Sequence, residues 1–196
     1  MSMKLSVCGL GVLLTTLSVG CTARPSESPV PDRSTPHYEP TATIKDLMDS
    51  IVDPAADVVW GSVTTVSDGS GVLEKAPHSD AEWFDVRLGA LRLVEASNLL
   101  LVPGRRAAAP GERSEAPGDE LEPEEIDALM AKDRAGWNKR AKDLHDAALE
   151  ALNAINAKNP QGIFEVGERI ERACENCHTQ YWYPNQRLPP GYGEAR

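Results

Sequence analysis

The residues best suited to chemistry are two cysteines and a histidine in the run Cys174-Glu175-Asn176-Cys177-His178. Positions 174, 177 and 178 are related as i, i+3 and i+4, so on a helix their three side chains share one face. Two thiols at this spacing can form thioether bonds with the two vinyl groups of a porphyrin, and the imidazole that follows can bind the iron. The pattern therefore predicts haem c, one per chain, covalently attached through Cys174 and Cys177, with His178 as the proximal iron ligand.

Three other interpretations of this motif are weaker. A thioredoxin-like redox pair normally lies in a βαβ context, and the sequence shows no sign of one. A zinc site needs four ligands, and the other histidines beyond residue 20 are isolated and far apart: His37, His78 and His145. A structural disulfide between the two cysteines would explain neither their spacing nor the histidine. Covalent haem is thus the strongest of the four interpretations.

Helical segments must position this motif, and the apolar periodicity predicts four of them. They cover residues 43–66, 79–102, 123–159 and 160–183. The predicted core stripe of the second runs through Phe84, Leu88 and Leu91. The fourth has an apolar stripe that continues into the haem motif, which places the haem inside the fold. Because no segment alternates with period two for long, we expect an all-α fold without a sheet, an antiparallel four-helix bundle with covalent haem on the C-terminal helix.

The N-terminal residues predict export. Residues 1–20 combine a short charged start, an apolar stretch and small residues at its end, as a secretory signal peptide does. The run from Ser18 to Cys21 resembles the bacterial lipobox, although leucine is usual where Ser18 stands. Lipid on Cys21 would hold the protein on a membrane surface, and Thr22 after it resembles the pattern of outer-membrane lipoproteins. We therefore predict an outer-membrane lipoprotein on the periplasmic side of a Gram-negative bacterium. Cleavage after Gly20 or Ala23 without lipid is the alternative.

The predicted organisation has three parts. Residues 1–20 are the signal, and residues 21–42 are the lipidated cysteine and a flexible, proline-rich tether. Residues 43–196 form the cytochrome domain, with a flexible loop at about 103–122 that is rich in Ala, Pro, Gly, Glu and Arg.

Charge and hydropathy exclude two classes of protein. The chain of 196 residues has 30 acidic and 20 basic side chains and a formal net charge of −10. A surface this acidic repels phosphate backbones, so we expect no nucleic-acid partner. No apolar run approaches the roughly 18 residues of a spanning helix, which argues against a polytopic membrane protein.

Four helices with the haem motif on the last one resemble the cytochrome c-prime superfamily, the class II c-type cytochromes. The resemblance covers about residues 43–183 and is strongest in the haem motif. Tyr181 matches an aromatic residue that this family often has three positions after the histidine, so we expect it to pack against haem. Trp182 stands where the family often has a basic residue. Residues 47–60 also resemble the first-helix region of exported cytochromes of this kind.

The resemblance also implies what occupies the sixth position on the iron. In the family the first helix covers that face; members with methionine there are six-coordinate electron carriers, and members with an apolar residue are five-coordinate and bind gases. Met48 lies on the predicted core stripe of the first helix, and its thioether is a soft ligand that raises the reduction potential. It is the expected sixth ligand. The alternatives are Met130, His145 or no protein ligand, with Met48 as ordinary core.

These features together predict a monohaem c-type cytochrome that transfers single electrons in the periplasm or at a membrane surface, rather than an enzyme. The alternative is a five-coordinate protein that binds nitric oxide or carbon monoxide; a haem-bearing module of a larger respiratory complex is a third interpretation. The expected partners are a redox protein and a membrane surface reached through the lipid, and the sequence is compatible with a homodimer. Arg187 is a candidate partner for a haem propionate.

Overall fold

The computed structural model describes residues 38–69 and 71–186. The predicted signal peptide, Cys21, most of the tether and Arg187 lie outside these described residues, and their predictions stay as they are. No helix in the described part of the chain is long and apolar enough to cross a membrane.

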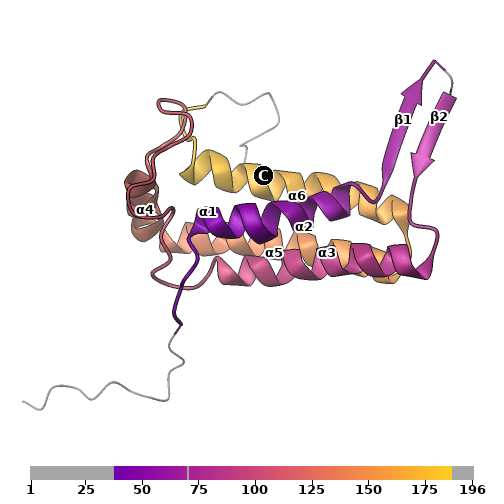
Figure 1. Cartoon of the computed structure of the whole chain (residues 1–196), viewed down its shortest axis with the longest axis horizontal. Helices are drawn as coiled ribbons and strands as arrows, with labels where there is room; N and C mark the ends of the chain where they lie inside the picture. Colours follow the sequence, from indigo (N-terminus) through magenta and orange to yellow (C-terminus); the bar gives the residue numbers. More distant parts are fainter. Residues whose placement is uncertain (1–37, 70, 187–196) are drawn as a thin grey trace, which may run out of the picture. The chain divides into compact units, whose positions relative to one another are not determined.

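The described residues are mostly helical, as the sequence predicts. The elements in chain order are α1 (Ile44–Leu47), η1 (Met48–Val52), α2 (Asp53–Trp60), β1 (Thr64–Asp68), β2 (Gly71–Lys75), α3 (Asp80–Leu99), α4 (Pro123–Lys132), α5 (Arg134–Asn156) and α6 (Pro160–Tyr181). Figure 1 shows the three long helices α3, α5 and α6 beside the continuous run formed by α1, η1 and α2.

The core lies between these helices. α5 packs along both α3 and α6, and α2 contacts both α3 and α6, so the contacts form a closed ring of helices. Small residues allow close approach where the long helices meet, and Ala90, Ala148 and Ala151 are completely buried there. Larger apolar side chains fill the space beside them, including Leu93, Ile155 and Ile170.

The first helical run begins at a capping box and changes its winding in the middle. The Thr43 hydroxyl accepts a hydrogen bond from the backbone N–H of Asp46, whose carboxylate accepts one from the Thr43 N–H. The π-helical turn η1 follows and ends just before Pro54. A proline ring crowds the carbonyl four residues earlier in a regular α-helix, and a wider turn relieves that contact.

The first helix is shorter than predicted, and the prediction of no sheet is wrong. α2 ends at Trp60, and β1 and β2 form an antiparallel hairpin in which Val66 is paired with Leu73. The run from 63 to 66 is Val-Thr-Thr-Val, whose β-branched residues favour extended backbone. Gly71 at the turn has a positive φ of 139°, a conformation that suits glycine. Val63 and Val66 also fit the three- and four-residue spacing of a helix, and for this reason the sequence predicts helix where the structure has β1.

The predicted third helix is divided into α4 and α5 at Asp133. This residue has φ −123° and ψ 58°, outside the helical region, and its carboxylate accepts a hydrogen bond from the Gly136 N–H at 2.9 Å. Asp133 is therefore the N-cap of α5, a role that aspartate favours because its side chain satisfies a free N–H in the first turn.

The buried face of α3 differs from the core stripe that the sequence predicts for the second helix. Phe84 is 56% exposed, whereas its neighbour Trp83 is buried with Val86 and Leu93. α3 has apolar residues on several sides, so the apolar pattern alone did not determine which side faces the core.

Residues 105–122 contain no helix, and part of this segment is packed against the helical run. Ala107 and Ala108 are buried. The backbone N–H groups of Ile44 and Lys45 donate to the carbonyl oxygens of Arg106 and Ala107 at 2.8 and 2.9 Å. The segment thereby satisfies N–H groups in the first turn of α1, which have no partner within a helix.

Candidate functional site

The α6 helix carries the predicted site residues. It begins at Asn159, whose side chain accepts a hydrogen bond from the Gly162 N–H at 3.1 Å, with Pro160 at its first position. Cys174, Cys177 and His178 all lie in its last turns, and the i, i+3, i+4 relation puts them on one face. Both cysteines are free thiols and partly exposed. No disulfide connects them.

Two cavities meet at these residues. The smaller has a volume of about 150 Å³ and the larger about 230 Å³. Five residues line both: Met48, Asp53, Trp137, Cys177 and His178. The structure thus brings Met48 from η1 and the cysteine and histidine of α6 to the same space.

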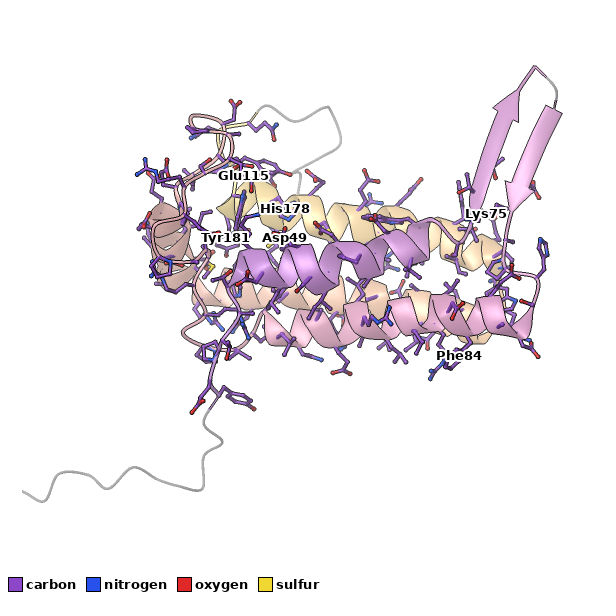
Figure 2. The ribbon with its side chains drawn as sticks, viewed as in Figure 1. Asp49, Lys75, Phe84, Glu115, His178 and Tyr181 are labelled. Atoms are coloured by element: carbon purple, nitrogen blue, oxygen red, sulfur yellow. The ribbon has the colours of Figure 1, made fainter. Side chains whose placement is uncertain are left out.

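The walls of the two cavities differ in character. Apart from the shared residues, the smaller cavity is lined by Cys174, by the charged side chains of Arg140, Glu171 and Glu175, and by mainly apolar side chains that include Val52, Ala56, Leu100, Ala141 and Leu144. The larger cavity reaches charged residues at its mouth: Lys45, Asp49, Arg113, Glu115 and Glu120. Figure 2 shows Asp49, Glu115, His178 and Tyr181 at one end of the helices, opposite the end with Lys75 and Phe84.

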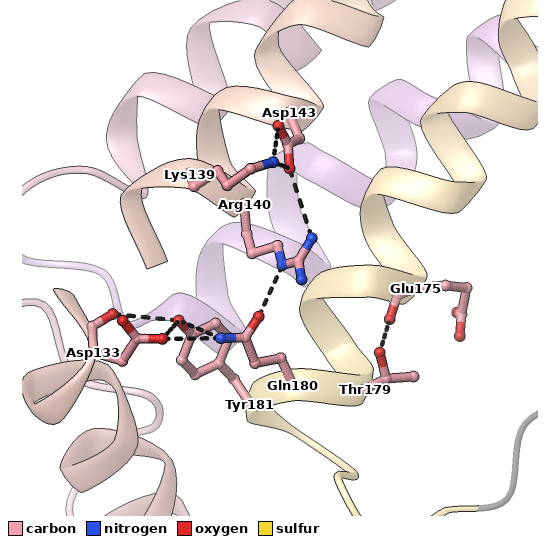
Figure 3. Close-up of polar contacts among 8 residues, drawn as sticks. All are labelled: Asp133, Lys139, Arg140, Asp143, Glu175, Thr179, Gln180 and Tyr181. Carbon is pink, nitrogen blue, oxygen red and sulfur yellow. Dashed lines mark hydrogen bonds and ion pairs between the residues drawn. The ribbon is translucent and has the colours of Figure 1, made fainter. Parts of the chain in front are cut away.

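Tyr181 closes the larger cavity and is almost completely buried. Its ring meets the Trp137 ring edge to face, with centroids 5.2 Å apart and planes at 75°. Its hydroxyl donates to the Asp133 carboxylate at 3.2 Å (Figure 3). The Trp137 indole N–H donates to the Leu100 carbonyl at 2.8 Å. These bonds fix the aromatic wall of the site to α3, α5 and α6 together.

The chain after α6 turns back over the histidine. The carbonyl oxygen of His178 accepts hydrogen bonds from the N–H groups of Trp182 and Tyr183, at 2.7 and 3.0 Å. The Tyr183 ring lies 5.9 Å from the imidazole, tilted by 60°, and its hydroxyl donates to the Glu175 carboxylate at 2.8 Å. The Leu121 N–H donates to the Trp182 carbonyl, which joins the 105–122 segment to this turn.

Burial controls the protonation of the motif. It raises the pKa of both Cys174 and Cys177 to about 12, so the thiols are protonated at neutral pH. Burial also lowers the pKa of His178, an effect that the nearby Glu175 carboxylate opposes. A neutral imidazole has a lone pair for a metal, whereas a protonated thiol is a poor metal ligand and a weak nucleophile.

The other predicted ligands lie away from this space. Met130 is buried on α4, and His145 on α5 lies beside Asp146, with Nδ1 3.3 Å from the carboxylate oxygen. Neither lines the two cavities. Within residues 38–69 and 71–186, no three His, Cys, Asp or Glu side chains lie close enough to hold a metal ion by themselves. The zinc interpretation therefore has no ligand set among these residues.

Sequence reasoning missed two residues of the site, Asp53 and Arg140. Asp53 lines both cavities, and burial raises its pKa. Arg140 of α5 lines the smaller cavity. A charged residue beside an apolar stripe looks like ordinary surface in a sequence, so no signal in the chain distinguished them from other acidic and basic residues.

Comparison with known proteins adds no assignment: no family model matches the chain, and neither a curated protein nor a solved structure matches it significantly.

Proposed function

We propose that this chain is a monohaem c-type cytochrome that carries single electrons, with α2, α3, α5 and α6 as a four-helix bundle of the cytochrome c-prime type. One observation carries the proposal: Cys174, Cys177 and His178 on one face of α6 line the same space as Met48 from η1. The protein is a carrier rather than a catalyst, and its partner is another redox protein.

The residues around the space fit a covalently held haem. Cys174 and Cys177 would hold the haem through thioether bonds, each S–H adding across a vinyl double bond so that sulfur joins one carbon and hydrogen the other, and the neutral imidazole of His178 would bind the iron. Bound haem supplies a one-electron couple, and the chain tunes it through its axial ligands and the burial of the site. Leu100, Trp137 and their apolar neighbours exclude water from the iron, while Met48 offers a soft sulfur ligand.

The first prediction concerns attachment. Haem should stay with the polypeptide in a denaturing gel and after acid–acetone extraction, because thioether bonds survive both. The double variant Cys174→Ala, Cys177→Ala should lose the haem stain entirely. The matched control is Cys21→Ala, which removes a cysteine outside the motif and should keep the full stain. Haem that extracts freely from the unmodified protein would refute covalent attachment.

A gas-binding function is the second candidate, and one observation favours it. The larger cavity reaches His178 and Met48 from a charged mouth, so it offers a small molecule a way to the iron if Met48 does not bind. Visible spectra of the oxidised and reduced protein separate the two functions. A low-spin spectrum in both states supports the carrier, and a high-spin spectrum with rapid carbon monoxide binding supports the gas binder.

The location follows from the N-terminal residues and belongs to the same proposal. Export with lipidation at Cys21 places the cytochrome on the periplasmic side of an outer membrane, where c-type haem is attached. The tether before residue 43 lets the domain meet a redox partner above the membrane, and a homodimer is compatible with this arrangement.

A further inference from the structure

Among the described residues, the smaller cavity has one cationic side chain in its lining, that of Arg140, together with the carboxylates of Asp53 and Glu175. The Arg140 side chain is only 21% exposed. A guanidinium is costly to remove from water unless its charge is paired, so the partners of Arg140 matter.

The known contacts of Arg140 use only part of its hydrogen-bonding capacity. Its Nε donates to the Gln180 side-chain oxygen at 2.8 Å. Its Nη1 lies 3.7 Å from the Asp143 carboxylate, beyond hydrogen-bond distance, and Lys139 already binds that carboxylate at 2.7 and 2.9 Å. A guanidinium has five N–H donors. Among the described residues, the contacts of Arg140 therefore leave Nη donors available beside the cavity.

A hydrogen-bond network through Gln180 and Asp133 fixes the position of the Arg140 side chain. Gln180 accepts from Arg140 through its oxygen, and through its nitrogen donates to the Asp133 carboxylate at 3.0 Å (Figure 3). Asp133 is itself fixed as the N-cap of α5. The guanidinium is thus oriented before any ligand binds, which reduces the conformational entropy lost on binding.

We propose that Arg140 binds a propionate carboxylate of the haem. This inference rests on the proposed function, because the propionate belongs to the haem held by Cys174, Cys177 and His178. A guanidinium pairs with a carboxylate through two parallel hydrogen bonds, the geometry for which its free donors are suited. Arg140 then compensates a negative charge that the neighbouring carboxylates would otherwise repel.

The other basic residues near the site are less suited to this role. Lys45 and Arg113 line only the larger cavity. Lys45 is already paired with Asp49 and Glu115, each at 2.9 Å, and Arg113 with Glu122 at 3.3 Å. The positive charges of Lys45 and Arg113 are therefore already paired with carboxylates of the protein.

The experiment compares Arg140→Gln, Arg140→Lys and the control Arg172→Gln, which removes an exposed positive charge from α6 that lines neither cavity. The readouts are the midpoint potential between pH 4 and 8 and the resonance Raman bending band of the propionates. In Arg140→Gln we expect a shifted Raman band and an equilibrium displaced about tenfold toward the oxidised haem, about 59 mV at pH 7. The freed propionate should regain an ordinary pKa, so the potential should rise as the pH falls through it. Arg172→Gln should show neither change.

Several outcomes overturn the proposal. An unchanged Raman band in Arg140→Gln with haem attached would refute it, and so would equal shifts of potential in Arg140→Gln and Arg172→Gln, which indicate a general effect of charge. If Arg140→Gln fails to fold, Arg140→Lys tests the proposal instead. Lysine keeps the positive charge but lacks the two parallel donors, so the propionate Raman band should shift while the midpoint potential changes by less than about 59 mV. Absence of haem from the unmodified protein refutes the proposed function instead.

Discussion

At the scale of single residues, the choice between the two proposed functions depends on Met48. Its side chain is partly buried in the π-helical turn and lines both cavities together with His178. A methionine on an apolar helical face usually packs in the core. Met48 instead borders open space, because its side chain lines both cavities. A thioether and an imidazole that line one space would both be available to hold an iron there.

Met48→Leu tests the assignment with little change of volume, and the packing loss should be below about 1.5 kcal/mol. If the sulfur binds iron, the reduced haem should become high-spin, bind carbon monoxide readily and have a lower potential. The control is Met130→Leu, on α4 away from both cavities, which should leave the spectra unchanged. A protein that is already high-spin, with spectra unaffected by Met48→Leu, would make Met48 ordinary core and favour gas binding.

The site residues that sequence could predict are those whose spacing has its own chemical meaning. The haem motif, Tyr181 and Met48 follow from helical periodicity and from the family resemblance, and the structure places them around one space. Arg140 and Asp133 act through contacts between helices far apart in the chain. Their importance depends on which helix faces meet, and composition and periodicity do not contain that information.

At the scale of elements, α2 and α3 approach each other closely at Gly89. A Cβ atom at Gly89 would lie 2.6 Å from Val58 Cγ1 and 3.3 Å from the Ala55 carbonyl oxygen. Side chains cannot approach this closely, so glycine lets the two helices pack together. This contact orients the run that carries Met48.

Gly89→Ala should therefore destabilise the protein by about 1–3 kcal/mol through overpacking, despite the better helix propensity of alanine. Gly167→Ala is the matched control in α6, because its Cβ would make an ordinary contact of 3.4 Å with Trp60. It should be neutral or stabilising by up to about 1 kcal/mol. Thermal unfolding of the haem-loaded proteins measures both. Equal destabilisation by the two variants would contradict the close contact.

The sequence predicts most of the helices correctly. The errors are the division between α4 and α5 and the β1–β2 hairpin, where two local sequence signals favour different structures. The predicted start of the second helix at residue 79 is confirmed: Ser79 is the N-cap of α3 and forms a capping box with Glu82. The division at Asp133 was missed because apolar periodicity continues through it, and a single cap residue is a weaker signal than twenty residues of helical pattern. In the β1 segment the helical spacing of the valines likewise outweighs the preference of β-branched residues for extended backbone.

At the scale of the whole molecule, the prediction concerns where the protein resides in the cell. With lipid on Cys21, the mature protein should separate with outer membranes, and Cys21→Ala should appear as a soluble periplasmic protein with the same visible spectrum. About 20 residues of tether, fully extended, span on the order of 65 Å. Cell fractionation and mass analysis of the N-terminal peptide measure the outcome. A mature N-terminus at Arg24 without lipid would refute lipidation and leave export intact.

The β1–β2 hairpin has a practical consequence. It extends from the end of the helices that carries Lys75, opposite the end with His178, and its strands pair with each other (Figure 2). Exposed turns are the positions where proteins best accept inserted sequence. A fluorescent reporter or a surface-binding peptide inserted at this turn should leave Met48 and His178 undisturbed, because the hairpin lies opposite the end with His178. The hairpin thus offers an attachment point for immobilising the protein with its candidate site turned away from the support.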